Sequence, residues 1–432
     1  LSLDEPLAAW QGKRWAFVWL GQGRWGMAAT TALLPTTVIP TVPTVLGVTA
    51  LAAALYLYAT RVLGVREWPA TLAVCVAVAH PVLAFSYSFS IISVGIGLGA
   101  LAVWGFAQAL TSMPTWKGAA VAAMVGGFAI GTYESHAVNL VLAIVGVLLF
   151  RFDLRWMWRA IVGLLASCLI YVAGRSLGRL ALNSEDAYIE SFFKEVGGPV
   201  GAANRAFSVF AITADTFLVT APAVWAFLAV SLTAALWRVV RLRSLRSGAL
   251  LAVVILTPIA VFIASPAAPL RSMLFVPWVW LIVCCWAFGN VSDWRRPGAL
   301  ALAALTLLAA VSHASVANRM FVGGRIAFDN DRAIAHEIER ARVSFAPDQT
   351  VPVVVSAGAF RRPNSTVAPT VETLGISMYA AEPFRAASFL QAIGVGVTVP
   401  RNAQVEASRP RLESMPTYPQ PGWIAYEEGV LL

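Results

Sequence analysis

Charged residues are scarce in this chain of 432 residues. Lys, Arg, Asp and Glu together make up 12% of it, whereas hydrophobic residues make up 59%. A soluble domain has about 25% charged residues, so this composition excludes an ordinary soluble protein. Apolar runs of about twenty residues recur instead, and each is long enough to cross a hydrocarbon core of about 30 Å. The sequence therefore predicts a protein that crosses a membrane many times.

Cysteine is equally scarce, and the motifs of soluble enzymes are missing. The four cysteines are Cys75, Cys168, Cys284 and Cys285. All fall in apolar runs without zinc-site spacing, so we interpret them as buried free thiols. No GxSxG or Walker pattern occurs in the chain. Gly95, Gly97 and Gly99 follow no strand, which favours close helix packing over nucleotide binding.

Ten apolar runs predict an all-α polytopic membrane domain over residues 43–316. The expected spans are 43–61, 69–88, 91–110, 118–133, 136–151, 158–178, 218–237, 248–265, 271–289 and 298–316. Residues 1–42 should form an outer-face loop with interfacial helices, because the apolar run 15–20 is short, tryptophan-rich and flanked by basic residues. We also expect a preceding segment, naturally a further span, before Leu1.

The basic residues predict the orientation of these spans. One set of alternate loops contains twelve Lys and Arg residues against three acids, a surplus equal to the formal net charge of +9. The twelve are Arg61, Arg66, Lys117, Arg151, Arg155, Arg159, Arg238, Arg241, Arg243, Arg246, Arg295 and Arg296. Loops rich in Lys and Arg face the cytoplasm. The positive charge is thus a topology signal, and it leaves no nucleic-acid footprint to explain.

The opposite, outer side then receives five polar features. They are the Asp4–Glu5 region, the 133–136 turn, the loop 179–217, the segment 265–271 and the tail after about residue 317. Residues 317–432 have the composition of a small periplasmic α/β domain. We expect helices at 328–343 and 384–393, strands at 351–355 and 397–399, and a third strand within 423–432.

The adjacent carboxylates Asp4 and Glu5 are the first candidates for chemistry. At a membrane surface such a pair can act as a general base, since proximity raises the pKa of one member. The pair could equally hold a divalent cation such as Mg²⁺ or Mn²⁺ through oxygen ligands. The structural alternative is a solvated loop or a helix N-terminal charge, because Pro6 follows directly.

Basic and polar residues on the predicted outer face are the next candidates. Arg24, between Gly23 and Trp25, could grip a phosphate or extend to lipid headgroups. Tyr133, Glu134 and His136 are suspected functional groups because ionisable residues at membrane depth are costly, unless their turn already lies in the aqueous interface.

Arg271 and His80 are two further polar residues for which a structural role must be weighed against a functional one. Arg271 begins a span on the outer face and suits an anion or plain interfacial anchoring. His80 precedes Pro81 within a span, and we interpret it as a hydrogen-bonded core residue.

At this point the chain resembles the bacterial and phage type II O-antigen glucosyltransferases, the serotype-converting group of the C-type (GT-C) membrane glycosyltransferases. The motifs that carry the resemblance are Asp4-Glu5, Gly23-Arg24-Trp25, Gly131-Thr132-Tyr133-Glu134, the Asp329 to Ile338 stretch, Leu374-Gly375-Ile376-Ser377 and Gly422-Trp423-Ile424. Each is short, and their order within the predicted topology gives the specificity.

The resemblance implies a polyprenyl-phosphate sugar donor, undecaprenyl-phosphate glucose above all, and a lipid-linked glycan acceptor such as an O-antigen unit. It implies that Asp4 is the base, that Glu5 is its partner or a metal ligand, and that Arg24 contacts the donor phosphate. Trp25 and the 133–136 turn would then contact substrate, and Arg271 would be a second phosphate contact.

Two other classes of protein remain as rivals. A transporter or flippase of a lipid-linked sugar would bury charges near the bilayer midplane and use broken helices. Most ionisable groups here cluster at the outer ends of the spans, which favours an enzyme. A non-catalytic assembly subunit would not need Asp4 and Glu5.

Overall fold

The computed structural model describes most of the chain and is predominantly helical. The described residues are 15–33, 41–113, 115–183, 200–201, 203–204, 207, 222–264, 272–289, 297–355, 379 and 383–432. They form two compact units, a helical unit within Lys13–Pro35 and Ile39–Asn318 and a tail unit within Arg319–Leu432.

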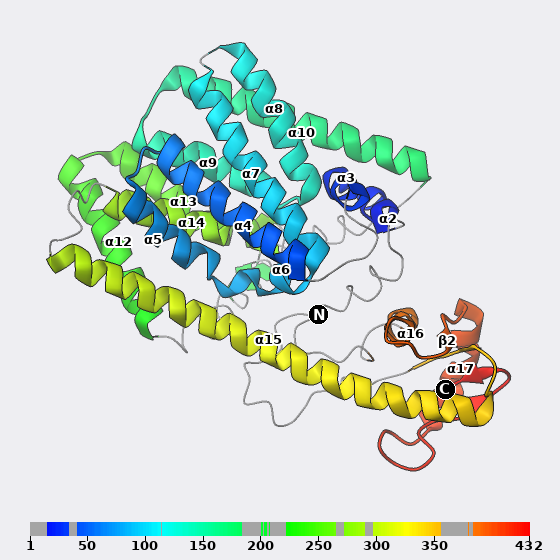
Figure 1. Ribbon diagram of the computed structural model, residues 1–432. Coiled ribbons are helices and arrows are strands. Elements are labelled where there is room, and N and C mark those ends of the chain that lie inside the picture. The colour runs from blue at the N-terminus through cyan, green and yellow to red at the C-terminus, as the bar shows by residue number, and fades with distance from the viewer. Residues whose placement is uncertain are drawn as a thin grey trace. The chain divides into compact units, whose positions relative to one another are not determined.

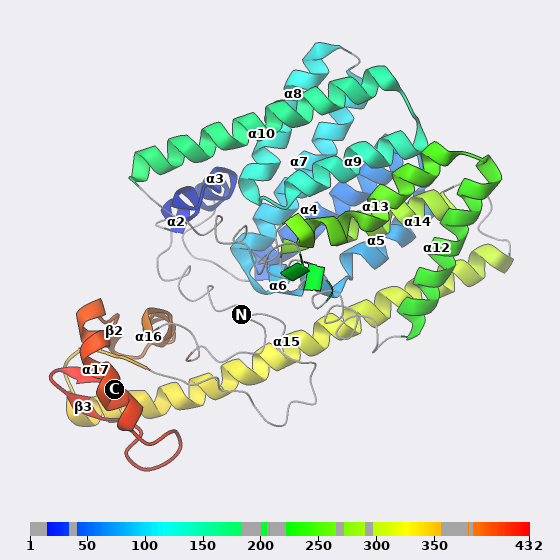
Figure 2. The ribbon, with the colours of Figure 1, turned by 180° about the vertical axis from the view of Figure 1, so that it is seen from behind.

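The helical unit consists of packed helices (Figures 1 and 2), the last of which, α15, continues into the tail unit. They are α2 (Trp15–Gly21), α3 (Trp25–Leu33), α4 (Thr41–Leu57), η2 (Tyr58–Val62), α5 (Glu67–Val78), η3 (Pro81–Leu83), α6 (Ala84–Ser88), α7 (Ser90–Ser112), α8 (Trp116–Thr132), α9 (His136–Phe150), α10 (Leu154–Leu182), α12 (Pro222–Leu242), α13 (Leu245–Ala264), α14 (Val276–Phe288) and α15 (Pro297–Phe345).

Among the described residues, five helices are long and apolar enough to cross a membrane. They are Val42–Val62, Ile92–Ser112, Leu154–Leu182, Pro222–Leu242 and Pro297–Phe345. Four shorter apolar helices accompany them: Glu67–Val78, His136–Phe150, Leu245–Val261 and Val276–Phe288. The protein is therefore a mostly helical, membrane-type protein, whereas the number of ten spans stays a prediction.

The prediction of one continuous span over 69–88 is wrong. Helix α5 ends at Val78, and two further short elements, η3 and α6, follow before α7 begins. Pro81 causes the break, because a proline disfavours helical geometry at the residue before it. His80 is accordingly extended, with a ψ of 129°, and its Nδ1 accepts a hydrogen bond from the Val82 amide at 3.2 Å. His80 is also 5% exposed, which confirms it as a hydrogen-bonded core residue.

The prediction that the last span ends near residue 316 and that a separate helix covers 328–343 is also wrong. Both belong to α15, which runs unbroken for 49 residues and contains the boundary between the two units. The intervening residues contain no proline, and the pair Gly323–Gly324 costs only about 1 kcal/mol per glycine relative to alanine. Helix formation is cooperative, so the helical segments on both sides extend through these two glycines.

Close helix contacts explain the glycines of α7. A Cβ on Gly97 would lie 2.4 Å from the carbonyl oxygen of Gly47 on α4, and a Cβ on Gly95 would collide with Met27. The predicted packing role of these glycines is confirmed. The four cysteines are all free thiols, with Cys284 and Cys285 buried and the other two partly exposed.

Four described arginines of the predicted cytoplasmic loops gather at one end of the helical unit, which we call the basic end. Their guanidinium groups join helix ends that are distant in sequence. Arg151 donates to the Val62 carbonyl (2.7 Å), Arg159 to the Met113 carbonyl (3.3 Å) and Arg238 to the Trp286 carbonyl, while Arg246 lies 4.2 Å from the Phe152 ring centroid.

The tail unit combines helix and short strands around its own core. After the end of α15 come β1 (Val351–Pro352), α16 (Pro383–Ala392), β2 (Val397–Thr398), α17 (Asn402–Ser414), β3 (Tyr426–Glu427) and β4 (Val430–Leu431). β1 and β2 are parallel with Val351 opposite Val397, and β3 and β4 are antiparallel. Phe389, Leu390 and Ile338 lie in the core that these elements share. The expected strands and the 384–393 helix are thus present, the strands being shorter than predicted.

Candidate functional site

Arg24 is positioned by the turn that ends α2. The Gly23 amide donates to the Leu20 carbonyl (3.0 Å) and the Arg24 amide to the Trp19 carbonyl (2.8 Å). This pair of bonds is the Schellman motif, which needs a left-handed residue at the position of Gly23, and Gly23 has a φ of +82°. The chain therefore reverses at Gly23 and places Arg24 at the junction of α2 and α3.

The Arg24 side chain is enclosed by Glu134 and two aromatic rings. Its Nε donates to both carboxylate oxygens of Glu134 at 3.1 Å, and its Nη1 donates to Gln22 at 3.3 Å. The guanidinium carbon lies 4.6 Å from the Tyr133 ring centroid and 5.6 Å from that of Trp19. Only 5% of the Arg24 side chain is exposed, against 25% of Glu134. We call these residues the Arg24–Glu134 cluster.

The turn that supplies Tyr133 and Glu134 is the predicted one, between α8 and α9. The His136 amide donates to the Tyr133 carbonyl at 2.9 Å, so the chain reverses within four residues. The Ser135 hydroxyl donates to the Ser272 carbonyl at 2.6 Å, which ties this turn to the segment before α14. Since α9 runs from this turn to Arg151, the cluster lies at the end of the helical unit opposite the basic end.

Trp25 packs between two helices. A Cβ on Gly131 of α8 would lie 2.6 Å from the Trp25 ring, and a Cβ on Gly174 of α10 would lie 2.5 Å from its Nε1. Helix α3 is thereby held against α8 and α10, as Figures 1 and 2 show for this region. The contacts of the Trp25 ring described here are with other residues of the protein, so a role in substrate binding stays a prediction.

His136 is fully enclosed at the start of α9. Its exposed fraction is 1%, and its Nδ1 lies 3.0 Å from Asn139 Nδ2. A Cβ on Gly99 would collide with His136 Nε2 and with the Thr132 hydroxyl, so α7 makes room for the imidazole. Its contacts are those of a core residue beside the cluster, and contact with substrate stays a prediction.

The predicted interfacial helix is present as α2, but its tryptophans are covered by protein. Trp15 and Trp19 are 6% and 4% exposed. They pack edge to face with ring centroids 5.8 Å apart, and α2 also contacts α10. Tertiary packing of α2 buries the rings that the sequence suggested for the lipid headgroups.

Helix α10 adds Arg175 to this site, a residue that is not among the candidates of the sequence analysis. Tyr171, Gly174, Arg175 and Gly178 follow the i, i+3, i+4, i+7 spacing of one helix face. Gly174 meets Trp25 and Gly178 meets Leu20, so this face is turned toward α2 and α3. Arg24, Glu134 and Arg175 all act electrostatically on the Tyr171 phenol. The helical spacing groups Arg175 with Gly174 and Gly178, but only the structure brings this face of α10 to the α2–α3 junction.

Three predicted site residues lie outside the described residues: Asp4, Glu5 and Arg271. Their assignments as base, partner or metal ligand, and phosphate contact stay predictions. Within the described part of the chain, no group of three or more His, Cys, Asp or Glu side chains could hold a metal ion.

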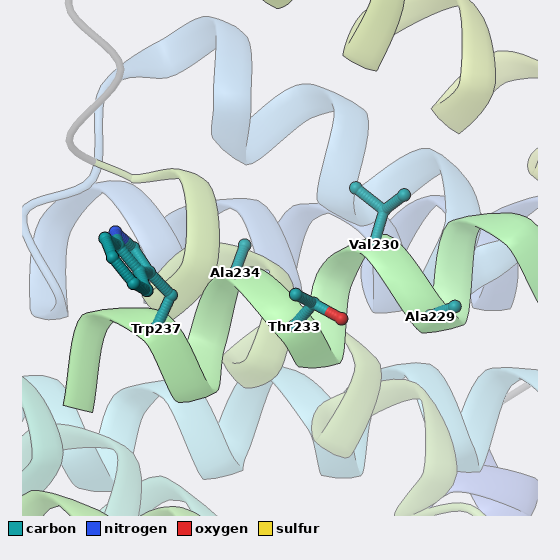
Figure 3. A pocket seen from close by; sticks show the side chains of 5 residues that line it. All are labelled: Ala229, Val230, Thr233, Ala234 and Trp237. Carbon is teal, nitrogen blue, oxygen red and sulfur yellow. The ribbon is translucent and has the colours of Figure 1, made fainter. Parts of the chain in front are cut away.

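A groove on the helical unit lies away from the cluster. It has a volume of about 460 Å³ and follows one side of α12, as Figure 3 shows. Its lining is Ala229, Val230, Thr233, Ala234 and Trp237. This lining has one hydroxyl and no charged side chain, so these residues provide no ion pair for a charged substrate.

No protein-family model, no curated protein and no solved structure matches this chain. The resemblance to O-antigen glucosyltransferases therefore stays a prediction that the motifs carry.

The arrangement as described provides fixed positive charge next to a carboxylate. Burying a charge is costly unless it is paired, and here Glu134 and the facing rings offset the cost of burying the Arg24 guanidinium. Such a site can attract an anionic group at a membrane surface. It can also hold the 133–136 turn and the α2–α3 junction in one fixed geometry.

Proposed function

We propose that this chain is a membrane glycosyltransferase. It would transfer a sugar, glucose being the one that the resemblance implies, from a polyprenyl-phosphate donor to a lipid-linked glycan such as an O-antigen unit. The observation that supports the proposal most is the Arg24–Glu134 cluster at the end opposite the basic end. Ionisable groups embedded among apolar helices are costly and mark functional sites.

The proposed reaction takes place at the membrane surface. The Asp4 carboxylate, with Glu5 beside it, removes the proton of an acceptor hydroxyl while that oxygen forms a bond to the anomeric carbon of the sugar. The bond between this carbon and the donor phosphate breaks, and the phosphate leaves with the bonding electron pair. Cationic groups at this end of the helices stabilise its negative charge. A Mg²⁺ or Mn²⁺ ion on Asp4 and Glu5 would serve the same purpose.

The proposal includes an orientation in the bacterial cytoplasmic membrane. The basic end faces the cytoplasm, and the cluster and the tail unit face the periplasm. Single cysteines at Ser184 and Ser244 should react with impermeant thiol reagents from the outside and only from the cytoplasm, respectively. The reverse labelling pattern would overturn the orientation.

Purified protein supplied with polyprenyl-phosphate glucose and a lipid-linked glycan tests the function directly. We expect glucose transfer by the natural sequence and a loss of at least about a hundredfold in rate with Asp4→Asn, since general-base catalysis contributes that much. Full turnover by Asp4→Asn would remove Asp4 as the base. Absence of any glucose transfer by the natural sequence would refute the proposed glycosyltransferase activity.

One feature favours the rival function of a lipid-linked-sugar transporter. The break between α5 and α7 places His80 next to His313 of α15, with ring centroids 4.7 Å apart, and both are buried. Broken helices with buried ionisable groups are typical of transporters. Passage of labelled lipid-linked sugar across reconstituted vesicles without new glycan would favour this rival over the enzyme.

A further inference from the structure

The side chain of Arg175 lies directly against the backbone of Gly23. A Cβ built on Gly23 would be 2.4 Å from Arg175 Cγ, 2.8 Å from Cδ and 3.1 Å from Nε. The side chain thus passes over the one residue at which the turn has no Cβ, and its Nε reaches Gly23, the residue just before Arg24. Gly23 is needed here for two reasons, its left-handed φ and the room that it gives to Arg175.

Arg175 lies near the level at which a lipid phosphate would sit. It follows Arg159, a residue of the basic end, by sixteen positions along α10. Sixteen residues of helix rise about 24 Å, close to the roughly 30 Å of a hydrocarbon core. The difference of about 6 Å between the helix rise and the core thickness is within reach of an extended arginine side chain.

Arg24 is poorly placed to receive a phosphate itself. Its Nε is shared between both Glu134 oxygens, rings lie within 6 Å of its guanidinium carbon, and its side chain is 5% exposed. A ligand would have to displace Glu134 to reach it. Arg175 is only partly buried, whereas Arg24 is buried.

We propose that Arg175 is the residue that contacts the phosphate of the polyprenyl-phosphate donor, and that Arg24 is a fixed positive charge beside it. This inference rests on the proposed function. Guanidinium is suited to the contact because its planar set of donors matches phosphate oxygens in a two-point geometry. Gly23 is then a positioning residue, because it permits Arg175 to lie over the turn that precedes Arg24.

Binding, measured apart from turnover, tests this assignment. Full-length protein in detergent or nanodiscs is titrated with polyprenyl phosphate and, separately, with the uncharged polyprenol of the same length. The ratio of the two affinities reports the phosphate contact, because the apolar tail is common to both. The natural sequence is compared with Arg175→Gln, Arg175→Lys and Arg179→Gln, the last being an arginine one turn further along α10.

We expect Arg175→Gln to lower the phosphate preference by about tenfold or more, since hydrogen bonds to charged groups are worth about 1.5–3 kcal/mol. Arg175→Lys keeps the charge and should fall between Arg175→Gln and the natural sequence, and it replaces Arg175→Gln if that variant does not fold. Arg179→Gln should change the preference by less than about threefold.

Two results would overturn different statements. Equal phosphate preference in Arg175→Gln and the natural sequence would refute the role of Arg175 and leave the proposed function in place. A natural sequence that binds polyprenyl phosphate no better than polyprenol would instead refute the donor class itself. An unchanged Arg175→Gln together with a weakened Arg179→Gln would move the phosphate contact one turn along α10.

Discussion

Arginines at the two ends of the helical unit are held in different ways. At the basic end, Arg151, Arg159 and Arg238 donate to backbone carbonyls at or near the ends of helices. Those carbonyls have no partner within their own helices and form the negative end of the helix dipole, so cations are stabilised there at little cost. Such contacts join neighbouring helices and need no acid.

At the opposite end Arg24 is held by a side-chain carboxylate and by aromatic rings. Glu134 comes from a turn 110 positions away in the sequence, and both groups are largely withdrawn from solvent. A buried ion pair contributes little net stability, because loss of hydration offsets the attraction between the charges. The comparison indicates that the arginines of the basic end serve helix packing, whereas the Arg24–Glu134 cluster is maintained at a cost that a function would explain.

The largest expected effect comes from breaking the ion pair on one side. Glu134→Gln leaves the Arg24 charge buried without its carboxylate, and we expect a loss of about 3 kcal/mol in unfolding free energy. Unfolding in mixed detergent, followed by circular dichroism, measures it. Glu406→Gln is the matched control, since it breaks an exposed pair with Arg409 and should cost less than about 1 kcal/mol.

The double variant Arg24→Met with Glu134→Leu sharpens this prediction. Replacing both charges by apolar residues should restore much of the stability that Glu134→Gln loses. If the double variant were as unstable as the single one, the cost would come from changed side-chain packing rather than from loss of the Arg24–Glu134 ion pair.

A smaller effect is expected at the basic end. Arg238 lies 3.9 Å from the Trp286 ring centroid and also donates to the Trp286 carbonyl. Arg238→Met should therefore cost about 1–2 kcal/mol in the same unfolding measurement. Arg241→Met, on an exposed position one turn along α12, is the control and should be near neutral. A loss for Arg238→Met larger than that for Glu134→Gln would contradict the difference between the two ends.

The hydrogen bond of Ser135 tests how firmly the 133–136 turn is held. Ser135→Ala removes the bond to the Ser272 carbonyl and should cost about 1 kcal/mol. Ser112→Ala is the control, because its hydroxyl is exposed and bonds within its own helix. Hydrogen exchange of the peptide containing residues 133–136 should accelerate in Ser135→Ala only. Unchanged exchange there would mean that the turn is held by the ion pair alone.

The smallest effect concerns the Arg342–Glu339 pair of the tail unit, which lies on α15 beyond the predicted span 298–316. A hydrogen bond from Arg342, helped by the Gly396 amide, lowers the pKa of Glu339 despite partial burial. A carboxyl with a lowered folded-state pKa stabilises the fold above its ordinary pKa of 4.5, and this contribution is lost as the pH falls through the lower folded-state value.

Hydrogen exchange of the 383–432 region from pH 7 down to pH 3 provides the measurement. Glu339→Gln should lower protection at pH 7 by less than about 1 kcal/mol, because 31% of the Glu339 side chain is exposed. The difference from the natural sequence should shrink below pH 4.5. A difference that persists unchanged at pH 3 would show that the carboxylate charge is not its source.

Much of the helical unit follows from local sequence. The apolar runs and their flanking arginines predict where helices begin and end, and the 133–136 turn lies where the sequence places it. The two corrections were also local in origin. Pro81 breaks the helix, and residues 317–345 contain no proline. Giving proline more weight than hydropathy would therefore have predicted both the break at residue 80 and the continuous α15.

The site was only half predictable. Arg24, Tyr133 and Glu134 were selected because charged and aromatic residues in such positions are unusual. The ion pair between Arg24 and Glu134 was not predicted, because a contact across 110 positions depends on how α2 and α3 pack against α8. Arg175 was not among the candidates for the same reason, since a single sequence does not tell which face of α10 meets Gly23.

The sequence by itself therefore determined the membrane class, most helix boundaries and the shared position of the basic loops. These depend on local properties, namely the length of apolar runs, proline and the spacing of charge. Only the tertiary structure decided that Arg24 is enclosed by Glu134 and Tyr133, that α15 is continuous, and that Arg175 lies over Gly23. Side-chain contacts between distant segments depend on the close approach of whole helices, which glycines at the crossing points permit and no local pattern specifies.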